Sequence, residues 1–392
     1  MRESAAERHD RLLELVRRRG SARVSDLAGQ LGVSPVTVRR DVEALAVRGL
    51  LDRVHGKVSW PHQEGAPGVP APGGAGGREL VLGMIAPNAT YYFAEVIRGA
   101  HEAAAAAGAR LILRISDYRP QEDAARAAGL LAAGAEGLLV APGWKEPHDP
   151  AEHGGWITGL PVPAVLLERR GVPGGALDDL DRVCSDHGHG VLLAVRHLTG
   201  LGHRAPLLVA RADSPTALAV RAGYRQALDA LGLAAPHPVI DSVPAEADPA
   251  GFEAAVGALA TAVRAGVASA ALVHNDVDAI RIAQRLGELG IRVPRDLALV
   301  AYDDEVAALA DTPLTAVAPP KHEVGRYAAQ LLVERLRGAT AGPDGEPQPC
   351  RHVDLLPRLR VRSSCGAPRP GTPAAAALPV ASPAALPEPR NG

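Results

Sequence analysis

The sequence is poor in aromatic residues, cysteine and lysine. Of its 392 residues, 3% are aromatic, three are cysteine, and only three of the 42 basic residues are lysine. Three scattered cysteines, Cys184, Cys350 and Cys365, cannot build a disulfide framework. No apolar run approaches the roughly 20 residues of a membrane-spanning helix, and the first 20 residues are charged throughout, unlike a signal peptide. We therefore expect a cytoplasmic protein that has no contact with a membrane.

Length and composition predict a globular protein of more than one domain. The chain is 47% hydrophobic and 22% charged, and its length exceeds what one core usually organises. The formal net charge of −2 gives no overall case for nucleic-acid binding. Residues 1–60, however, hold twelve basic and eight acidic residues, a local excess of +4 that could contact phosphates.

Residues 34–45 carry the pattern of a short helix with one buried face. Ser34 is a natural N-cap and Pro35 suits the first helical position. Val38, Val42 and Leu45 recur at helical spacing and define an inward stripe. On other faces near the start lie Val36, Thr37, Arg39 and Arg40. Small and cationic residues there suit a DNA major groove, which predicts a recognition helix.

The flanking residues complete a winged helix-turn-helix pattern. Amphipathic residues 12–16 run to Gly20, a second helix opens at Ser25, and Gly32 turns the chain into the recognition helix. Residues 50–54 and 57–60 read as two strands around His55-Gly56, a wing whose tip places Arg53, His55 and Lys57 near phosphates. The alternative, a three-helix protein-interaction module with a solvated charged face, has the same helix spacing but leaves the wing unexplained.

With its "TVRRDVEAL…GLLDRVHGK" run, the segment 8–58 resembles the winged helix-turn-helix of DeoR-type bacterial repressors. The resemblance implies that Ser34, Val36, Thr37, Arg39, Arg40, Arg53, His55 and Lys57 contact operator DNA. Lys57 stands where the family usually has a second glycine.

Beyond residue 60 the composition changes twice. Residues 61–79 are Pro/Gly-rich and predict a linker, and residues 366–392 are Pro/Ala-rich and predict a disordered tail. Between them, strand-like and helical stretches alternate, which predicts parallel sheets covered by helices on both faces, in two lobes. Strands are expected at 80–86, 110–115, 137–141, 162–167, 205–210, 239–242, 268–274 and 297–301, and helices near 92–107, 121–133, 187–200, 216–232, 250–265 and 276–289.

Residues 80–365 resemble the LacI-type regulators and periplasmic sugar-binding proteins. The resemblance rests on "LGMIAPNATYYFAEVIRGAHEAA", "GAEGLLVAP", "RHLTGLGHR", "RAGYRQAL", "NDVDAI…RLGELGIRVPRDLALVAYDD" and "LLPRLRVRSS", in order. It implies a two-lobed ligand-sensing and dimerisation domain whose cleft binds a small molecule, most often a sugar or nucleobase. Carried over singly, the family's effector-binding positions are Tyr92, Phe93, Asp117, Trp144, Glu168, Asp186, Asn275 and Asp303.

Three positions depart from the family pocket. Val220 stands where a ligand-clamping Arg is usual, with Arg221 one step later and about 100° around a helix. Glu246 replaces a common aromatic residue and Pro319 replaces a usual Gln. The ligand class is therefore open.

Other chemistries compete with binding. Cys184-x-x-His187-x-His189, with His197 and His203, could hold a transition metal, although no second cysteine pair accompanies it. Asp303-Asp304 could be a catalytic pair, but adjacent residues on a turn point apart and no nucleophile accompanies them. A sugar-phosphate-processing enzyme or sensor domain of the DeoR type would need a phosphate-cradling glycine loop after a strand, and 80–365 has none.

Together the two resemblances predict a homodimeric transcription regulator, a repressor, that is not an enzyme and uses no metal or cofactor. Its partners are operator DNA and a small-molecule effector, a sugar or related metabolite. Residues 61–79 show no hinge helix of the LacI type, so we expect the effector to act by changing the separation of the two DNA-binding heads through the dimer interface.

Overall fold

The computed structural model divides into two compact units, residues 1–78 and 79–392. In the second unit it describes residues 79–145, 149–233, 238–338 and 348–367. In the first unit it describes residues 11–13, 15–16, 21–31, 33, 38, 42, 52–54 and 57–59. Most of the predicted linker and tail, and five predicted DNA contacts at Ser34, Val36, Thr37, Arg39 and Arg40, lie outside these residues. His55 does as well.

The first unit has a small antiparallel sheet and a compact core. Strands β2 (Asp52–Val54) and β3 (Lys57–Ser59) pair in register Val54↔Lys57, which confirms the predicted hairpin and places the backbones of Arg53 and Lys57 on it. Strand β1 (Ser21–Arg23), not predicted, pairs with β3, and α2 (Val24–Leu31) follows it directly. The buried core contains Leu12, Val16, Ala22, Leu27, Ala28, Leu31, Val38 and Val42. Two of the three stripe residues, Val38 and Val42, thus face inward as expected.

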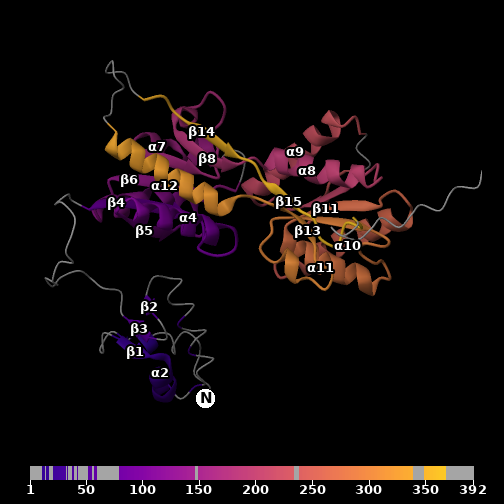
Figure 1. Ribbon diagram of the computed structural model, residues 1–392, viewed down its shortest axis with the longest axis horizontal. Helices are drawn as coiled ribbons and strands as arrows, with labels where there is room; N and C mark the ends of the chain where they lie inside the picture. The colour runs from indigo at the N-terminus through magenta and orange to yellow at the C-terminus, as the bar shows by residue number, and fades with distance from the viewer. Residues whose placement is uncertain are drawn as a thin grey trace, which may run out of the picture. The chain divides into compact units, whose positions relative to one another are not determined.

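The second unit contains two six-stranded sheets, one in each lobe (Figure 1). The first sheet is parallel and has the order β14-β8-β7-β6-β4-β5. Its strands are β4 (Leu80–Ala86), β5 (Ala109–Ile115), β6 (Gly137–Val140), β7 (Ala164–Leu167), β8 (Asp181–Ser185) and β14 (His352–Leu355). The second has the order β10-β9-β11-β12-β13-β15, with only β15 antiparallel. Its strands are β9 (Leu207–Ala210), β10 (Ile240–Asp241), β11 (Ala270–His274), β12 (Ala298–Tyr302), β13 (Thr315–Ala318) and β15 (Arg358–Arg360).

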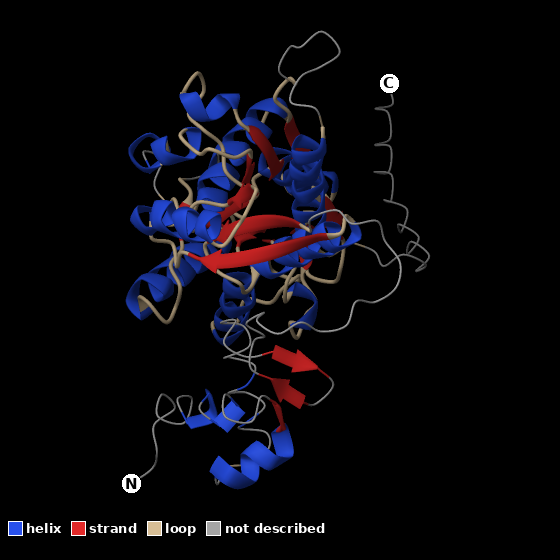
Figure 2. Ribbon diagram, turned by 90° about the vertical axis from the view of Figure 1, so that its left-hand side faces the viewer, coloured by secondary structure: helices blue, strands red, loops and turns tan. Residues whose placement is uncertain are grey.

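Helices cover both faces of each sheet (Figure 2). The first lobe contains α4 (Tyr92–Ala106), α5 (Pro120–Ala132), α6 (Asp149–His153), α7 (Gly155–Thr158), α12 (Lys321–Arg337) and the 3₁₀ turn η1 (Ala176–Asp179). The second contains α8 (His187–Gly200), α9 (Pro215–Ala230), α10 (Pro249–Arg264), α11 (Asp276–Glu288) and η2 (Ala307–Leu309). Each sheet is therefore buried on two sides, which is why its central strands are continuous apolar runs.

The predicted strands and helices of both lobes are confirmed. The elements that were missed include the short α6, α7, η1 and η2, and also β8, β13, α12, β14 and β15, which lie at or next to the places where the chain passes between the lobes. Three such passages exist in the described residues, from β8 to α8, from β13 to α12 and from β14 to β15. Helix α12 returns to the first lobe and packs on α4 so closely that Gly99 and Gly325 leave no room for a Cβ atom.

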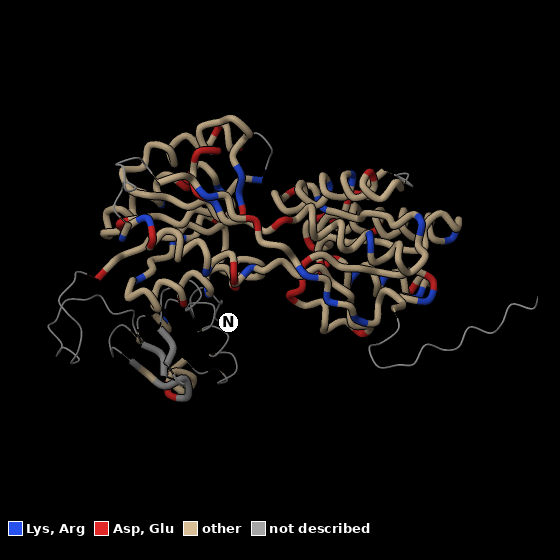
Figure 3. The backbone as a smooth tube through the Cα atoms, turned by 45° about the horizontal axis from the view of Figure 1, so that its top comes forward, with Lys and Arg blue, Asp and Glu red and all other residues tan. Residues whose placement is uncertain are grey.

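Charged residues of both signs are interspersed over the helices of the second unit (Figure 3). In the part of the chain with described coordinates, no helix is both long and apolar enough to cross a membrane.

Candidate functional site

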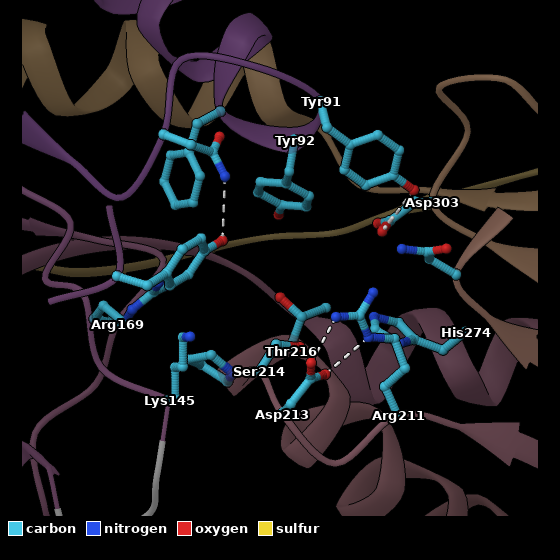
Figure 4. Close-up of a pocket in the computed structure, with 15 residues that line it drawn as sticks. Tyr91, Tyr92, Lys145, Arg169, Arg211, Asp213, Ser214, Thr216, His274 and Asp303 are labelled. Atoms are coloured by element: carbon cyan, nitrogen blue, oxygen red, sulfur yellow. Dashed lines mark hydrogen bonds and ion pairs between the residues drawn. The ribbon is translucent and has the colours of Figure 1, made fainter. Parts of the chain in front are cut away.

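A cavity of about 300 Å³ lies between the lobes of the second unit, where the carboxyl ends of the parallel strands face each other (Figure 4). This edge is the usual ligand position in open α/β sheets. The first lobe contributes Asn88, Tyr91, Tyr92, Phe93, Tyr118, Lys145 and Arg169. The second contributes Arg211, Asp213, Ser214, Pro215, Thr216, His274, Asn275 and Asp303.

The first-lobe wall is aromatic and is held by a buried carboxylate. Tyr92, at the start of α4, donates its hydroxyl hydrogen bond to Glu168 Oε1 at 2.7 Å. Glu168 also accepts from the Ser185 amide at 3.0 Å and from the Ser185 hydroxyl at 2.8 Å. Since these donors satisfy the carboxylate, Glu168 orients the Tyr92 ring.

Two buried polar atoms on the second-lobe wall have no hydrogen-bond partner: His274 Nδ1 and Asp303 Oδ1. Burial lowers the pKa of His274 to about 3, so its imidazole is neutral at physiological pH. Burial raises the pKa of Asp303 to about 7, an effect that the charge of Lys321 opposes. Unpartnered buried polar atoms are costly, and both line the cavity, so they are available to a hydroxyl-bearing ligand.

Tyr91 connects the two lobes across the cavity. It comes from the loop before α4, and its hydroxyl donates to Asp276 Oδ1 at 2.5 Å and lies 3.4 Å from Asp303 Oδ2. Asp276 Oδ2 in turn accepts the backbone amides of residues 305–307 at 2.6 to 3.0 Å. The described arrangement of the lobes is therefore closed at this side.

Three cations line the cavity, and only one of them is paired with a carboxylate of the residues that the structure describes. Arg211 forms a two-hydrogen-bond ion pair with Asp213, at 2.8 and 2.6 Å. Arg169 is 5% exposed and donates only to backbone carbonyls, those of Pro142 at 3.0 Å and Glu168 at 2.8 Å. Its burial lowers the pKa of the guanidinium. Lys145 Nζ lies 5.2 Å from the centre of the Tyr118 ring.

A second cavity of about 210 Å³ adjoins the first and shares Lys145, Arg169, Pro215 and Thr216 with it. Its remaining wall is more apolar. It is formed by Trp144, Pro150, Glu168, Arg170, Cys184, Ser185, His187, Leu218 and Ala219. Trp144 Nε1 is buried there without a partner.

The structure brings most of the expected effector-binding residues together. Tyr92, Phe93, Asn275 and Asp303 line the first cavity, and Trp144 and Glu168 line the second. Two line neither. Asp117 is exposed because it and Tyr118 have positive φ angles of 53° and 56°, and it is Tyr118 that lines the cavity. Asp186 accepts the His189 amide at 2.8 Å and caps α8.

The three departures from the family pocket have other surroundings. Val220 is fully buried in the core of the second lobe. Arg221 donates to the Arg211 carbonyl at 2.8 Å, and Glu246 pairs with Arg281 at the surface. Pro319 lines a separate surface depression.

Sequence reasoning missed eleven lining residues of the first cavity: Asn88, Tyr91, Tyr118, Lys145, Arg169, Arg211, Asp213, Ser214, Pro215, Thr216 and His274. Each lies at or just after the carboxyl end of a predicted strand, so strand ends alone could have indicated them.

The competing chemistries find no support in the geometry. Within the described residues no three His, Cys, Asp or Glu side chains converge as a metal site. The Cys184 thiol donates to the Arg169 carbonyl, and burial raises the pKa of this thiol to about 12. Asp304 is paired with Arg362 at 2.7 Å and with Arg360 at 3.1 Å, whereas Asp303 faces the cavity.

Comparison with known proteins finds a family match within each of the two units of the chain. Residues 8–64 match a DeoR-like helix-turn-helix domain, and residues 195–365 match a periplasmic binding protein-like domain. The HTH-type transcriptional regulator DegA of Bacillus subtilis is 27% identical over 346 residues, 87% of this chain and 97% of its own. The ribose operon repressor of Escherichia coli is 27% identical over 66% of this chain and 76% of its own.

Among solved structures, a sugar-binding transcriptional regulator of the LacI family from Escherichia coli is 25% identical with a TM-score of 0.58, covering 72% of this chain and 97% of its own. These relatives are transcriptional regulators and not enzymes. The chain thus joins a DeoR-like helix-turn-helix domain to a periplasmic binding protein-like domain similar to that of LacI-family regulators, and it is a DNA-binding transcriptional regulator.

Proposed function

We propose that the protein is a repressor whose operator affinity is set by a polyhydroxylated small molecule bound between the lobes. The observation that carries this proposal is the pairing of an aromatic wall with two unpartnered buried polar atoms, His274 Nδ1 and Asp303 Oδ1, in one cavity between the lobes. Hydroxyl groups can bond to these atoms, and Tyr92 and Phe93 can pack on the C–H face of a sugar. The names of the relatives, which include a ribose operon repressor, favour the sugar class.

Effector binding would act by holding the lobes closed. Because the cavity is lined from both lobes, a ligand that fills it contacts the closed arrangement more than an open one and shifts the population toward it. Tyr91, which reaches from the first lobe to Asp276 of the second, would add to the same state.

In the DNA-binding unit, the proposed contacts are those of the recognition helix and the wing. Thr37 and Arg40 would approach bases, while Arg39, Arg53 and Lys57 would contact phosphates. Ser34, Val36 and His55 complete the set. A homodimer would place two such units on the half-sites of an inverted repeat.

A gel shift with the promoter region of the protein's own operon, combined with a thermal-shift screen of sugars, tests both halves. A sugar that binds should raise the melting temperature and change operator retention. Arg40→Ala should abolish specific retention, while the matched change Arg98→Ala, on an exposed face of α4, should leave it intact. Retention by Arg40→Ala equal to wild type would refute the recognition-helix assignment.

A further inference from the structure

The two cavities meet at a cluster of positive charge. The residues common to both linings are Lys145 and Arg169 from the first lobe and Pro215 and Thr216 from the second. Pro215 and Thr216 form the first turn of the 16-residue helix α9, whose N-terminal end carries partial positive charge. Figure 4 shows Arg169 and Lys145 on one side of the cavity and Asp303 and His274 on the opposite side.

The positive charges of this cluster are only partly compensated within the described residues. Arg211 is neutralised by Asp213, and Arg170 by Asp354 at 2.7 Å. Glu168 accepts hydrogen bonds from Tyr92 and Ser185, and its charge acts on Arg169 without a described hydrogen bond between the two side chains. No ion pair joins Arg169 or Lys145 to a carboxylate that the structure describes.

Arg169 is the informative member of the cluster because it is 95% buried, with a relative exposure of 5%. Its guanidinium packs 5.7 Å from the centre of the Phe93 ring, and its two backbone partners leave donors unused, since a guanidinium has five. Burial lowers the pKa of this guanidinium although the charge of the neighbouring Glu168 raises it, so the cost of burying the cation is only partly offset. An anion in the cavity would remove that cost and would be held by charge-assisted hydrogen bonds.

We infer that the effector is an anionic polyol, a sugar derivative whose carboxylate or phosphate group lies against Arg169, Lys145 and the first turn of α9 while its hydroxyls reach His274 and Asp303. This inference rests on the proposed function and narrows its ligand class. It also accounts for Val220: the clamping cation that is missing from α9 is supplied by Arg169 at the end of β7, across the cleft.

The test is isothermal titration of the full chain with matched triples: ribose, ribonate and ribose 5-phosphate, then the same three forms of glucose and of galactose. We expect at least one anion to bind at least about tenfold more tightly than its neutral parent, a difference of about 1.4 kcal/mol. Carboxylate and phosphate members tell which acidic group is recognised. Tighter binding of a neutral sugar than of its anions, or no binding by any member, would overturn the inference.

Variants separate the charge cluster from the rest of the cavity. Arg169→Met and Lys145→Met each replace one cation by an uncharged side chain of similar length. Each change should lower the affinity for the anion at least about tenfold. The affinity for the neutral parent sugar, if it binds, should change by no more than about twofold. Lys145 is exposed, so its variant folds even if Arg169→Met does not. Arg98→Met, an exposed paired cation on α4, is the control and should bind as wild type. Unchanged anion affinity in Lys145→Met and in folded Arg169→Met would overturn the inference.

A gel shift distinguishes this inference from the proposed function. An anion that binds through Arg169 but leaves operator retention unchanged would refute the regulatory proposal and keep the ligand class. A neutral sugar that binds more tightly than its anionic forms and alters retention would refute the ligand class and keep the regulatory proposal.

Discussion

Replacing Gly325 by alanine should destabilise the second unit, because α4 and α12 cross there with their backbones in contact. A Cβ atom on Gly325 would lie 1.8 Å from the Val96 carbonyl oxygen, whereas ordinary contacts begin at 3.4 Å. The helices must therefore separate by roughly 1.6 Å, and no side-chain rotation can relieve the clash. Overpacking costs about 1–3 kcal/mol. We take the upper end and subtract about 0.8 kcal/mol for the helix propensity that alanine gains over glycine, which leaves about 2 kcal/mol.

Calorimetry of the full chain measures this cost directly. A loss of about 2 kcal/mol should lower the melting temperature of the second unit by about 4–8 °C. The matched control is Gly257→Ala on the exposed face of α10, where a Cβ atom meets nothing within 4 Å. That variant should gain about 0.5–1 kcal/mol and melt higher. If Gly325→Ala also melts higher than wild type, the crossing is not as tight as described and the reasoning fails.

Two further predictions concern the cavity. Burial raises the pKa of Asp303 from 3.8 to about 7, so the folded protein retains a proton that the unfolded chain loses between these values, and this carboxyl lowers stability progressively as the pH rises from about 4 to 7. Asp303→Asn lacks that loss, so its melting temperature relative to wild type should increase over this pH range; a difference independent of pH would contradict the assignment. Tyr91→Phe removes the hydrogen bond to Asp276, which keeps three backbone donors. The loss of about 1.5 kcal/mol should weaken effector affinity roughly tenfold in titration calorimetry, and an unchanged affinity would show that this bond does not favour the closed state.

The regular α/β rhythm was predictable because a buried strand must be apolar along its whole length. Strand β4 lies at Leu80–Ala86 as expected. Strand β8 (Asp181–Ser185) was missed because it begins with two charged residues, which are not typical of a buried strand. In the structure, Asp181 forms an ion pair with Arg335 of α12, a residue 154 positions later in the sequence, so its burial could not be expected from the local sequence. Helix α12 has apolar residues at helical spacing, but it was missed because it departs from the strand–helix alternation of the second lobe and returns to the first lobe.

The sequence predicted that the site lies at the carboxyl ends of the strands, but it did not predict which individual side chains line it. Asn275 and Asp303 directly follow strands β11 and β12, so their approach to the cleft follows from the sheet. The neighbours Asp117 and Tyr118 could not be ranked, because a left-handed backbone conformation decides which one faces inward. Arg169 was missed because its role depends on its burial and on which groups donate to or accept from its guanidinium, and only the three-dimensional structure reveals these neighbours.

The repeated passage of the chain between the lobes has a consequence for synthesis. Helix α12 covers the face of α4, and β14 completes the first sheet, yet both are made after strands β9 to β13 of the second lobe. Strand β15, which completes the second sheet, is made later still. Neither lobe can therefore close its core until residues 321–360 have left the ribosome, and the apolar face of α4 depends until then on protection from aggregation. A chain that ends before α12 would lose parts of both lobes at once, so neither lobe is complete in a fragment that stops there.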